Sequence, residues 1–178
     1  MKLEAEIAGG IALWDATGIL PQGSGKYRAR RKPIDRLIIH HSGALGSPGI
    51  NGIISSAMYV VAHRGWPGFA YTFWVPYHRV RDDKKRIIVY RGNEDVTRSF
   101  HTSGSNERGV AVCLQGNLTN RGPTRAQVEV LEALIPWAFD HYGFDSPECL
   151  TWHSEIGRKK SCPGAPTVKW LTEYREAM

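Results

Sequence analysis

The chain has 178 residues, of which 42% are hydrophobic and 22% are charged, and its formal net charge is +6. These values are ordinary for a globular protein, so a disordered or fibrous chain is excluded, and the length suits one domain with a substantial core. The positive charge favours an anionic partner, and nucleic acid, anionic lipid and bacterial wall polymers all qualify. No apolar run approaches the ~18 residues that a membrane span requires.

The first 33 residues precede the strongly patterned part of the chain. Three charged residues, among them Lys2, come before a short apolar patch at residues 7–14, and no small-residue cleavage site follows. We therefore predict no secretory signal. A basic run at residues 28–32 is typical of a solvated surface. We expect residues 1–33 to form an N-terminal extension that packs on or near the main domain.

Residues 34–39 give the first strong strand pattern. They are apolar without alternation, as in a strand that is buried on both faces. Residues 50–63 predict a helix, which the Gly-Trp-Pro-Gly sequence at residues 65–68 would stop. Further strands are predicted where β-branched and aromatic residues gather, at residues 70–75, 86–90 and 110–114. A hairpin turn at residues 79–86 is expected to join the first two of these strands.

The C-terminal third predicts two helices. Thr124 and Gln127 fit a capping box, apolar residues follow at helical spacing, and Gly143 is the expected end of this helix. The last helix should begin near Pro166, since proline is accepted at a first helical position. Strands interrupted by helices predict an α/β fold, in which a single domain has a central mixed β-sheet flanked by helices.

Two potential metal ligands lie close together near the end of the chain. His153 and Cys162 are nine residues apart, and zinc accepts nitrogen and sulfur ligands on one tetrahedral ion. A catalytic zinc site needs a third protein ligand, and the candidates are His40 and His41 at the end of the first predicted strand. Successive strand side chains point to opposite faces, so these two histidines cannot both reach one ion.

Four segments together carry a more specific signal. They are residues 38–42 (Ile-Ile-His-His-Ser), 69–73 (Phe-Ala-Tyr-Thr-Phe), 106–117 (Asn-Glu-Arg-Gly-Val-Ala-Val-Cys-Leu-Gln-Gly-Asn) and 153–163, which begins with His-Ser-Glu and ends with Cys-Pro. In this order they resemble the zinc-dependent N-acetylmuramoyl-L-alanine amidases of the type 2 family. That family includes phage endolysins and shares its fold with the peptidoglycan recognition proteins. The resemblance covers about residues 34–176 and implies a zinc amidase catalytic domain at residues 34–178.

The resemblance implies a role for several individual residues. The metal ligands of the family fall on His40, His153 and Cys162, with Zn²⁺ as the cofactor. The catalytic lysine of the family falls on Lys160. Its active-site tyrosine falls on Tyr71, whose hydroxyl can hydrogen-bond a developing oxyanion.

Two further residues have roles outside the catalytic group. His101 matches a histidine that relatives carry at the edge of the substrate groove, so we predict that it contacts substrate. Glu155 stands two residues after a metal ligand, and we expect it to orient the site rather than to act as the base.

The function implied is hydrolysis of the amide between N-acetylmuramic acid and L-alanine in peptidoglycan. The chain looks most like a compact phage or prophage endolysin, made in the bacterial cytoplasm without a signal peptide and acting on the periplasmic wall after release, and we expect a monomer. The alternative is a peptidoglycan-binding module that does not cleave, although such relatives typically lose the cysteine ligand and this chain keeps Cys162. A nucleic-acid partner is disfavoured, because basic and aromatic residues are not interleaved as in single-strand binders.

Overall fold

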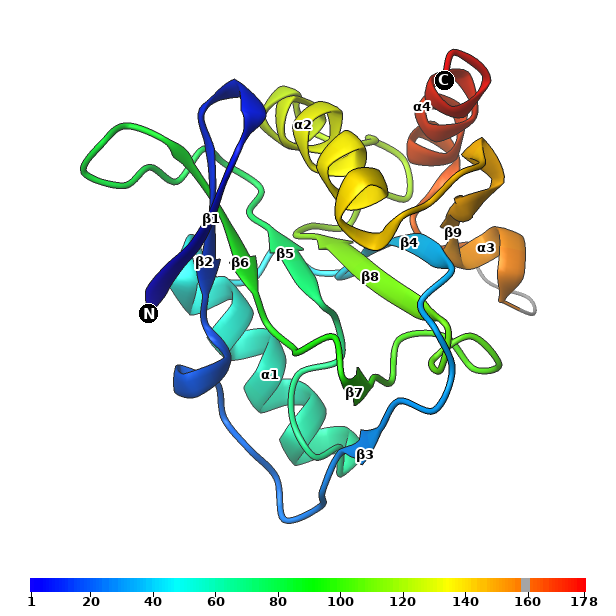
Figure 1. The fold of residues 1–178 in the computed structure, drawn as a ribbon. Coiled ribbons are helices and arrows are strands. Elements are labelled where there is room, and N and C mark those ends of the chain that lie inside the picture. The colour runs from blue at the N-terminus through cyan, green and yellow to red at the C-terminus, as the bar shows by residue number, and fades with distance from the viewer. Residues whose placement is uncertain (158–160) are drawn as a thin grey trace.

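A mixed seven-stranded sheet forms the centre of the molecule in the computed structural model, which describes residues 1–157 and 161–178 (Figure 1). The strands of this sheet follow the spatial order β1-β2-β6-β5-β8-β4-β9. Their bounds are β1 Lys2–Ile7, β2 Ile11–Asp15, β4 Arg36–His41, β5 Phe73–Val75, β6 Ile87–Arg91, β8 Gly109–Leu114 and β9 Leu150–Trp152. Two short strands, β3 (Arg28–Ala29) and β7 (Thr97–Arg98), pair separately in a second small sheet.

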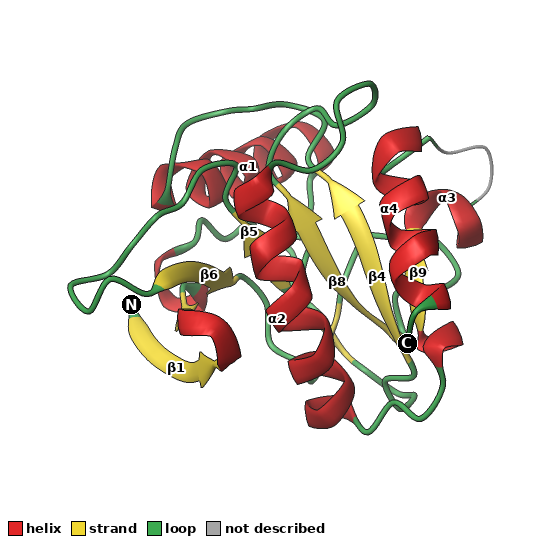
Figure 2. Ribbon diagram, turned by 90° about the horizontal axis from the view of Figure 1, so that it is seen from above, coloured by secondary structure: helices red, strands yellow, loops and turns green. Residues whose placement is uncertain are grey.

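Helices cover both faces of the large sheet. They are α1 (Ile50–Arg64), α2 (Arg125–Tyr142), α3 (His153–Ile156) and α4 (Ala165–Glu176), with short 3-10 turns at Ala8–Gly10, Thr17–Ile19 and Pro147–Cys149. Helices α2 and α4 lie over one face and α1 over the other, as Figures 1 and 2 show from two directions. None of the described helices is both long and apolar enough to cross a membrane.

The sheet separates two hydrophobic cores. On the side of α2 and α4, alternate strand residues such as Leu37, Ile39 and Val112 pack against α2 residues such as Leu131. On the side of α1, Trp74 and Cys113 pack with Ile53 and Ala57 of the helix. Residues 37–40 of β4 are all buried, as the absence of alternation predicts.

The predicted α/β class with a central mixed sheet is confirmed. Strands β8, β4 and β9 run parallel, whereas β5 and β6 are antiparallel and are joined through the predicted turn. The expected helices at residues 50–63 and 124–142 correspond to α1 and α2, and the last helix contains Pro166 in its first turn.

The N-terminal residues extend the sheet with two strands that the sequence did not predict. Strand β2 pairs with β6 in parallel and β1 pairs with β2 in antiparallel fashion. The Arg91 guanidinium, which is buried, forms ion pairs with Glu4 of β1 at 2.6 Å and with Asp95 at 2.9 Å. Residues 2–15 are therefore part of the sheet and of its core.

Helix α2 begins with the predicted capping box. Thr124 Oγ1 accepts a hydrogen bond from the Gln127 backbone N–H at 3.2 Å, and the Gln127 side chain accepts one from the Thr124 N–H at 3.1 Å. The Thr124 hydroxyl also donates to the Tyr77 carbonyl oxygen at 2.9 Å. Gly143 ends the helix with φ 66°, a left-handed conformation that glycine adopts without a steric penalty.

We expect Thr124→Ala to lower the free energy of unfolding by about 1 to 2 kcal/mol, because the cap and the link to Tyr77 are lost together. Urea unfolding followed by circular dichroism measures this change. Thr124→Ser, which keeps the hydroxyl, is the matched control and should stay near the wild type. Equal stability of the Ala and Ser variants would contradict a stabilising role for the box.

Candidate metal centre and active site

Parallel strand pairing brings two histidines together. Strands β4 and β9 pair in a register that sets Ile39 opposite Trp152. The next residues along the two strands are His40, which is fully buried, and His153, which opens α3. Their ring centroids lie 4.6 Å apart.

Cys162 reaches the same point from the turn before α4. Its Sγ lies 3.8 Å from His40 Nδ1 and accepts a hydrogen bond from the His41 backbone N–H at 3.3 Å. The Cys162 carbonyl accepts from the Ser154 N–H at 2.7 Å, which ties this turn to α3. One ligand atom from each of His40, His153 and Cys162 lies within 4.8 Å of the others.

This group fits a tetrahedral zinc ion by spacing and by chemistry. Zn–N bonds of about 2.0 Å and Zn–S bonds of about 2.3 Å place neighbouring ligand atoms roughly 3.5 Å apart. The observed 3.8 Å between His40 Nδ1 and Cys162 Sγ is close to that value. Burial, together with the nearby His101 and His153, lowers the pKa of His40 well below its usual value, and an imidazole must be neutral to bind a metal ion.

His41 points to the other face of the sheet. Its Nδ1 accepts a hydrogen bond from the Leu118 backbone N–H at 3.0 Å. The His41 backbone contacts the group through the bond to Cys162 described above. The alternation of side chains along β4 therefore separates the two histidines, as the strand argument predicts.

Tyr71 lies beside the candidate metal centre. Its ring centroid is 5.1 Å from that of His40 and 5.5 Å from that of Phe69. Burial raises the pKa of Tyr71 well above its usual value, and its hydrogen bond with the Cys113 thiol acts in the same direction. The Tyr71 side chain is therefore neutral, and its ring packs next to that of His40.

His101 packs against His40 beneath the surface. Its ring is 6% exposed, its Nδ1 lies 3.3 Å from His40 Nε2, and its Nε2 lies 3.3 Å from the Gly109 carbonyl oxygen. Burial lowers the pKa of His101 to about 3. The predicted contact of His101 with substrate stays a prediction. Thr102, which the sequence analysis did not single out, also contacts His40, with Oγ1 at 3.3 Å from Nε2.

Glu155 pairs with α4. Both of its carboxylate oxygens accept from Arg175 Nη1, at 2.9 and 3.2 Å. The same guanidinium lies 4.4 Å from the centroid of the Trp152 ring. Glu155 therefore ties α3 to α4, next to His153. Lys160, the predicted catalytic lysine, and its neighbour Lys159 lie outside the described residues.

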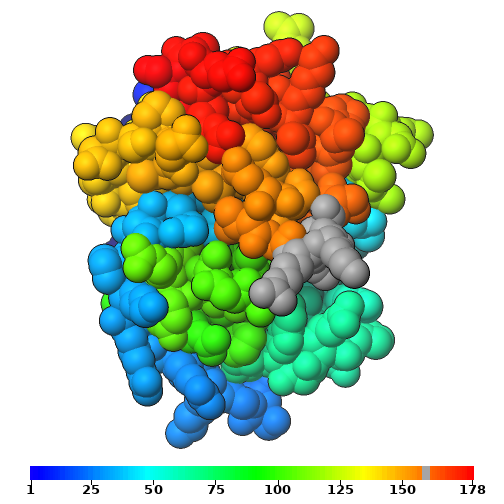
Figure 3. Space-filling model, turned by 90° about the vertical axis from the view of Figure 1, so that its right-hand side faces the viewer, coloured from blue at the N-terminus to red at the C-terminus, as the bar shows by residue number. Residues whose placement is uncertain are grey.

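A groove of about 530 Å³ lies along the loop that follows β4. Its walls are the loop at residues 42–46 and the face of α1 that carries Ser55 and Tyr59, and Trp74 and Arg64 also line it. On the surface turned toward the viewer in Figure 3, orange atoms of the β9–α3 region adjoin green atoms of the segment around residue 100. The first segment carries His153 and the second carries His101, and the rings of both pack against the His40 ring.

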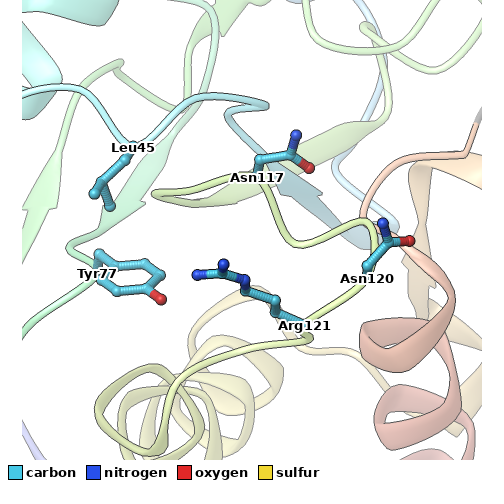
Figure 4. A pocket seen from close by; sticks show the side chains of 5 residues that line it. All are labelled: Leu45, Tyr77, Asn117, Asn120 and Arg121. Carbon is cyan, nitrogen blue, oxygen red and sulfur yellow. The ribbon is translucent and has the colours of Figure 1, made fainter.

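A second, polar hollow of about 300 Å³ lies beyond the same loop. Leu45 lines both hollows and is 50% exposed. Figure 4 shows the Arg121 side chain extending from its loop toward Tyr77 and Leu45, with Asn117 and Asn120 nearby.

The fold and the site together define an α/β domain with a His-His-Cys group that can bind a metal ion. The family model described as N-acetylmuramoyl-L-alanine amidase matches residues 30–165, and the chain belongs to this family. A human N-acetylmuramoyl-L-alanine amidase is 28% identical over 153 residues, which cover 80% of this chain and 25% of the relative. The chain thus spans about a quarter of the length of that curated relative.

Solved structures show the same fold. The N-acetylmuramoyl-L-alanine amidase LysC from Clostridium intestinale URNW aligns with a TM-score of 0.68 at 19% identity, over 92% of this chain and 97% of that one. The Drosophila peptidoglycan recognition protein SD aligns with a TM-score of 0.75 at 14% identity, over 92% and 94% of the two chains. The resemblance to amidases and peptidoglycan recognition proteins found in the sequence is therefore confirmed.

We expect His40→Ala to abolish stoichiometric metal binding and His41→Ala to retain it, because only the first side chain faces Cys162 and His153. His41→Ala should instead lose some stability with its bond to Leu118. Elemental analysis of the two purified variants beside the wild type measures bound metal per chain. Equal loss of metal from both would contradict the assignment of His40 as the ligand.

Proposed function

We propose that this protein is a zinc-dependent hydrolase that cleaves the amide bond between N-acetylmuramic acid and L-alanine in peptidoglycan. The observation that carries this proposal is the group formed by His40, His153 and Cys162, within a chain of the amidase family. Two imidazoles and one thiolate suit zinc, and three protein ligands are the number found in catalytic zinc sites.

The three ligands would hold zinc at the ends of β4 and β9. A zinc ion held in this way polarises a carbonyl group and makes hydroxide available near neutral pH. The buried, neutral ring of His40 is in the protonation state that binding requires. The ion pair between Glu155 and Arg175 would keep α3, and with it His153, at a fixed distance from β4.

Tyr71 and Lys160 would act on the amide bond that is cleaved. Charge builds on the carbonyl oxygen as the amide is attacked, and a preorganised donor there stabilises the transition state more than the ground state. We propose Tyr71, whose neutral side chain packs beside His40, as such a donor. Lys160 is proposed as the cationic partner of that oxygen, from its match to the family motif.

The groove along α1 would hold the substrate. It runs along the loop at residues 42–46, which follows β4, and Leu45 of this loop also lines the polar hollow near Arg121. Tyr59 offers exposed aromatic surface, and Arg64 and Arg121 offer positive charge to carboxylates of the peptide. The net charge of +6 favours an anionic wall polymer over long range.

A non-cleaving peptidoglycan receptor is the second candidate. It is favoured by the fold shared with peptidoglycan recognition proteins, one of which, the LE protein, aligns with a TM-score of 0.74 and is described in complex with tracheal cytotoxin, a monomeric diaminopimelic acid-type peptidoglycan. A receptor has no need of a thiolate next to two imidazoles. The position of Cys162 Sγ therefore favours the hydrolase.

The biological setting that we propose is lysis of a bacterial host by a phage or prophage enzyme. A protein described as the endolysine N-acetylmuramoyl-L-alanine amidase LysCS from Clostridium intestinale URNW shares the fold, with a TM-score of 0.67 at 19% identity, and this likeness motivates the proposal. The enzyme would be a monomer that is made in the host cytoplasm and acts on the periplasmic wall after release.

Mass spectrometry of purified peptidoglycan after incubation tests the proposed bond. We expect free stem peptides that begin with L-alanine, and we expect chelation to abolish their release and added Zn²⁺ to restore it, because the ligands bind the ion reversibly. Cys162→Ser is the matched control, and it should bind muropeptides while releasing little or no peptide. Release of sugar fragments alone, or undiminished cleavage by a metal-free protein, would refute the proposal.

Two variants test the groups that are proposed to act on the carbonyl oxygen. Tyr71→Phe and Lys160→Ala should each keep bound zinc and lose about 100- to 1,000-fold in turnover, the usual effect of removing one oxyanion donor. Lys159→Ala is the matched control for the lysine and should remain near the wild type. Steady-state rates on a soluble muropeptide, with zinc content measured in parallel, decide the outcome. A crippled Lys159→Ala beside an active Lys160→Ala would move the assignment to Lys159.

A further inference from the structure

A buried hydrogen-bonded set lies on the side of His40 that faces away from Cys162. His40 is fully buried, Thr102 is 1% exposed and His101 is 6% exposed. Three polar atoms meet there, and each is within 3.3 Å of the other two: His40 Nε2, His101 Nδ1 and Thr102 Oγ1. The other nitrogen of His101 lies 3.3 Å from the Gly109 carbonyl oxygen.

The donors and acceptors of this set can be assigned by starting from the Gly109 carbonyl oxygen. A carbonyl oxygen only accepts, so His101 Nε2 must carry the hydrogen that faces Gly109. Both rings are buried, where a charge is costly, so each carries a single N–H. His101 Nδ1 then has a lone pair and can only accept.

The hydrogen on His40 follows from that assignment. If His40 Nε2 carries the hydrogen, it donates to His101 Nδ1, or to Thr102 Oγ1 while the threonine hydroxyl donates to His101. Both arrangements place a hydrogen in front of the His101 lone pair, and the second also gives the threonine hydroxyl an acceptor. If His40 Nε2 were bare, two ring lone pairs would face each other at 3.3 Å. His40 therefore has its hydrogen on Nε2 and a free lone pair on Nδ1, the atom that lies 3.8 Å from Cys162 Sγ.

We propose that His101 and Thr102 are positioning residues that hold His40 in the tautomer and orientation in which Nδ1 is free to bind the metal ion. This inference rests on the metal centre put forward under the proposed function. It differs from the predicted role of His101, because the ring acts through His40 and not on substrate. The low exposure of His101 and the use of both its nitrogens inside the protein support this reading.

The segment that carries the pair is itself anchored. The Thr102 backbone N–H donates to Asn106 Oδ1 at 2.8 Å. The Arg30 guanidinium donates to the carbonyl oxygens of Asp95, Thr97 and Asn106 at 2.8 to 3.2 Å. The basic run at residues 28–32 thus places one arginine, half-buried, where it holds the chain on both sides of His101.

Zinc affinity, measured by competition with a chromophoric chelator, tests the proposal without any assay of activity. His101→Leu removes the acceptor and should weaken zinc binding about 10- to 100-fold, as loss of an outer-shell partner of a ligand typically does. His101→Asn is the conservative control, since its amide oxygen stands near the Nδ1 position, and it should bind zinc within a few-fold of the wild type. Thermal unfolding of the metal-free proteins checks that both variants fold.

The outcomes separate this inference from the proposed function. Wild type that binds no zinc would overturn the metal centre itself. Wild type that binds zinc, together with His101→Leu that binds it as tightly, would overturn only the positioning role. In His101→Leu, a raised KM for muropeptide with unchanged zinc affinity would also overturn the positioning role. It would support the predicted contact of His101 with substrate.

A measurement on the wild type keeps the proposal testable if His101→Leu does not fold. Two-bond proton–nitrogen correlation spectra of the metal-free protein with labelled histidine distinguish the protonated ring nitrogen from the bare one. We expect both His40 and His101 to carry hydrogen on Nε2. A His40 ring with hydrogen on Nδ1 would overturn the proposal.

Discussion

The parallel pairing of β4 with β9 is the constraint on which the candidate site depends. Parallel strands end at the same edge of a sheet, so the residues that follow Ile39 and Trp152 must lie side by side. His40 and His153 are those residues, although more than a hundred positions separate them in the chain. The turn that carries Cys162 is then bonded to both, through the His41 and Ser154 backbone N–H groups. No local segment could assemble the group by itself.

The supports of this site come from every part of the molecule. The second core, under α1, carries Cys113, whose thiol is hydrogen-bonded to the Tyr71 hydroxyl. Helix α4 holds α3 through the bond from Arg175 to Glu155, and the N-terminal extension holds the His101 segment through Arg30. Such outer contacts matter because a ligand set needs a fixed geometry as well as the right donors. The proposed chemistry is therefore a property of the whole domain.

Several features of the fold and site could be predicted from local patterns. The apolar run before His40, the capping box at Thr124 and the glycine at 143 each reflect short-range forces, and each corresponds to an observed element. The opposite directions of His40 and His41 follow from strand geometry alone. The strands at residues 2–7 and 11–15 were missed, because residues 11–15 pair with residues 87–91, about 75 positions away along the chain, and residues 2–7 in turn pair with residues 11–15.

The sequence by itself determined the family, the α/β class and the residues that can serve as ligands, since these depend on residue types and their spacing. Only the tertiary structure decided which atoms meet. It placed Nδ1 of His40 toward Cys162 and Nε2 toward His101 and Thr102. It also turned Glu155 toward Arg175 and buried His101. The physical reason is that side-chain direction and burial are set by packing between strands, helices and loops that are distant in the chain, and no local pattern records those contacts.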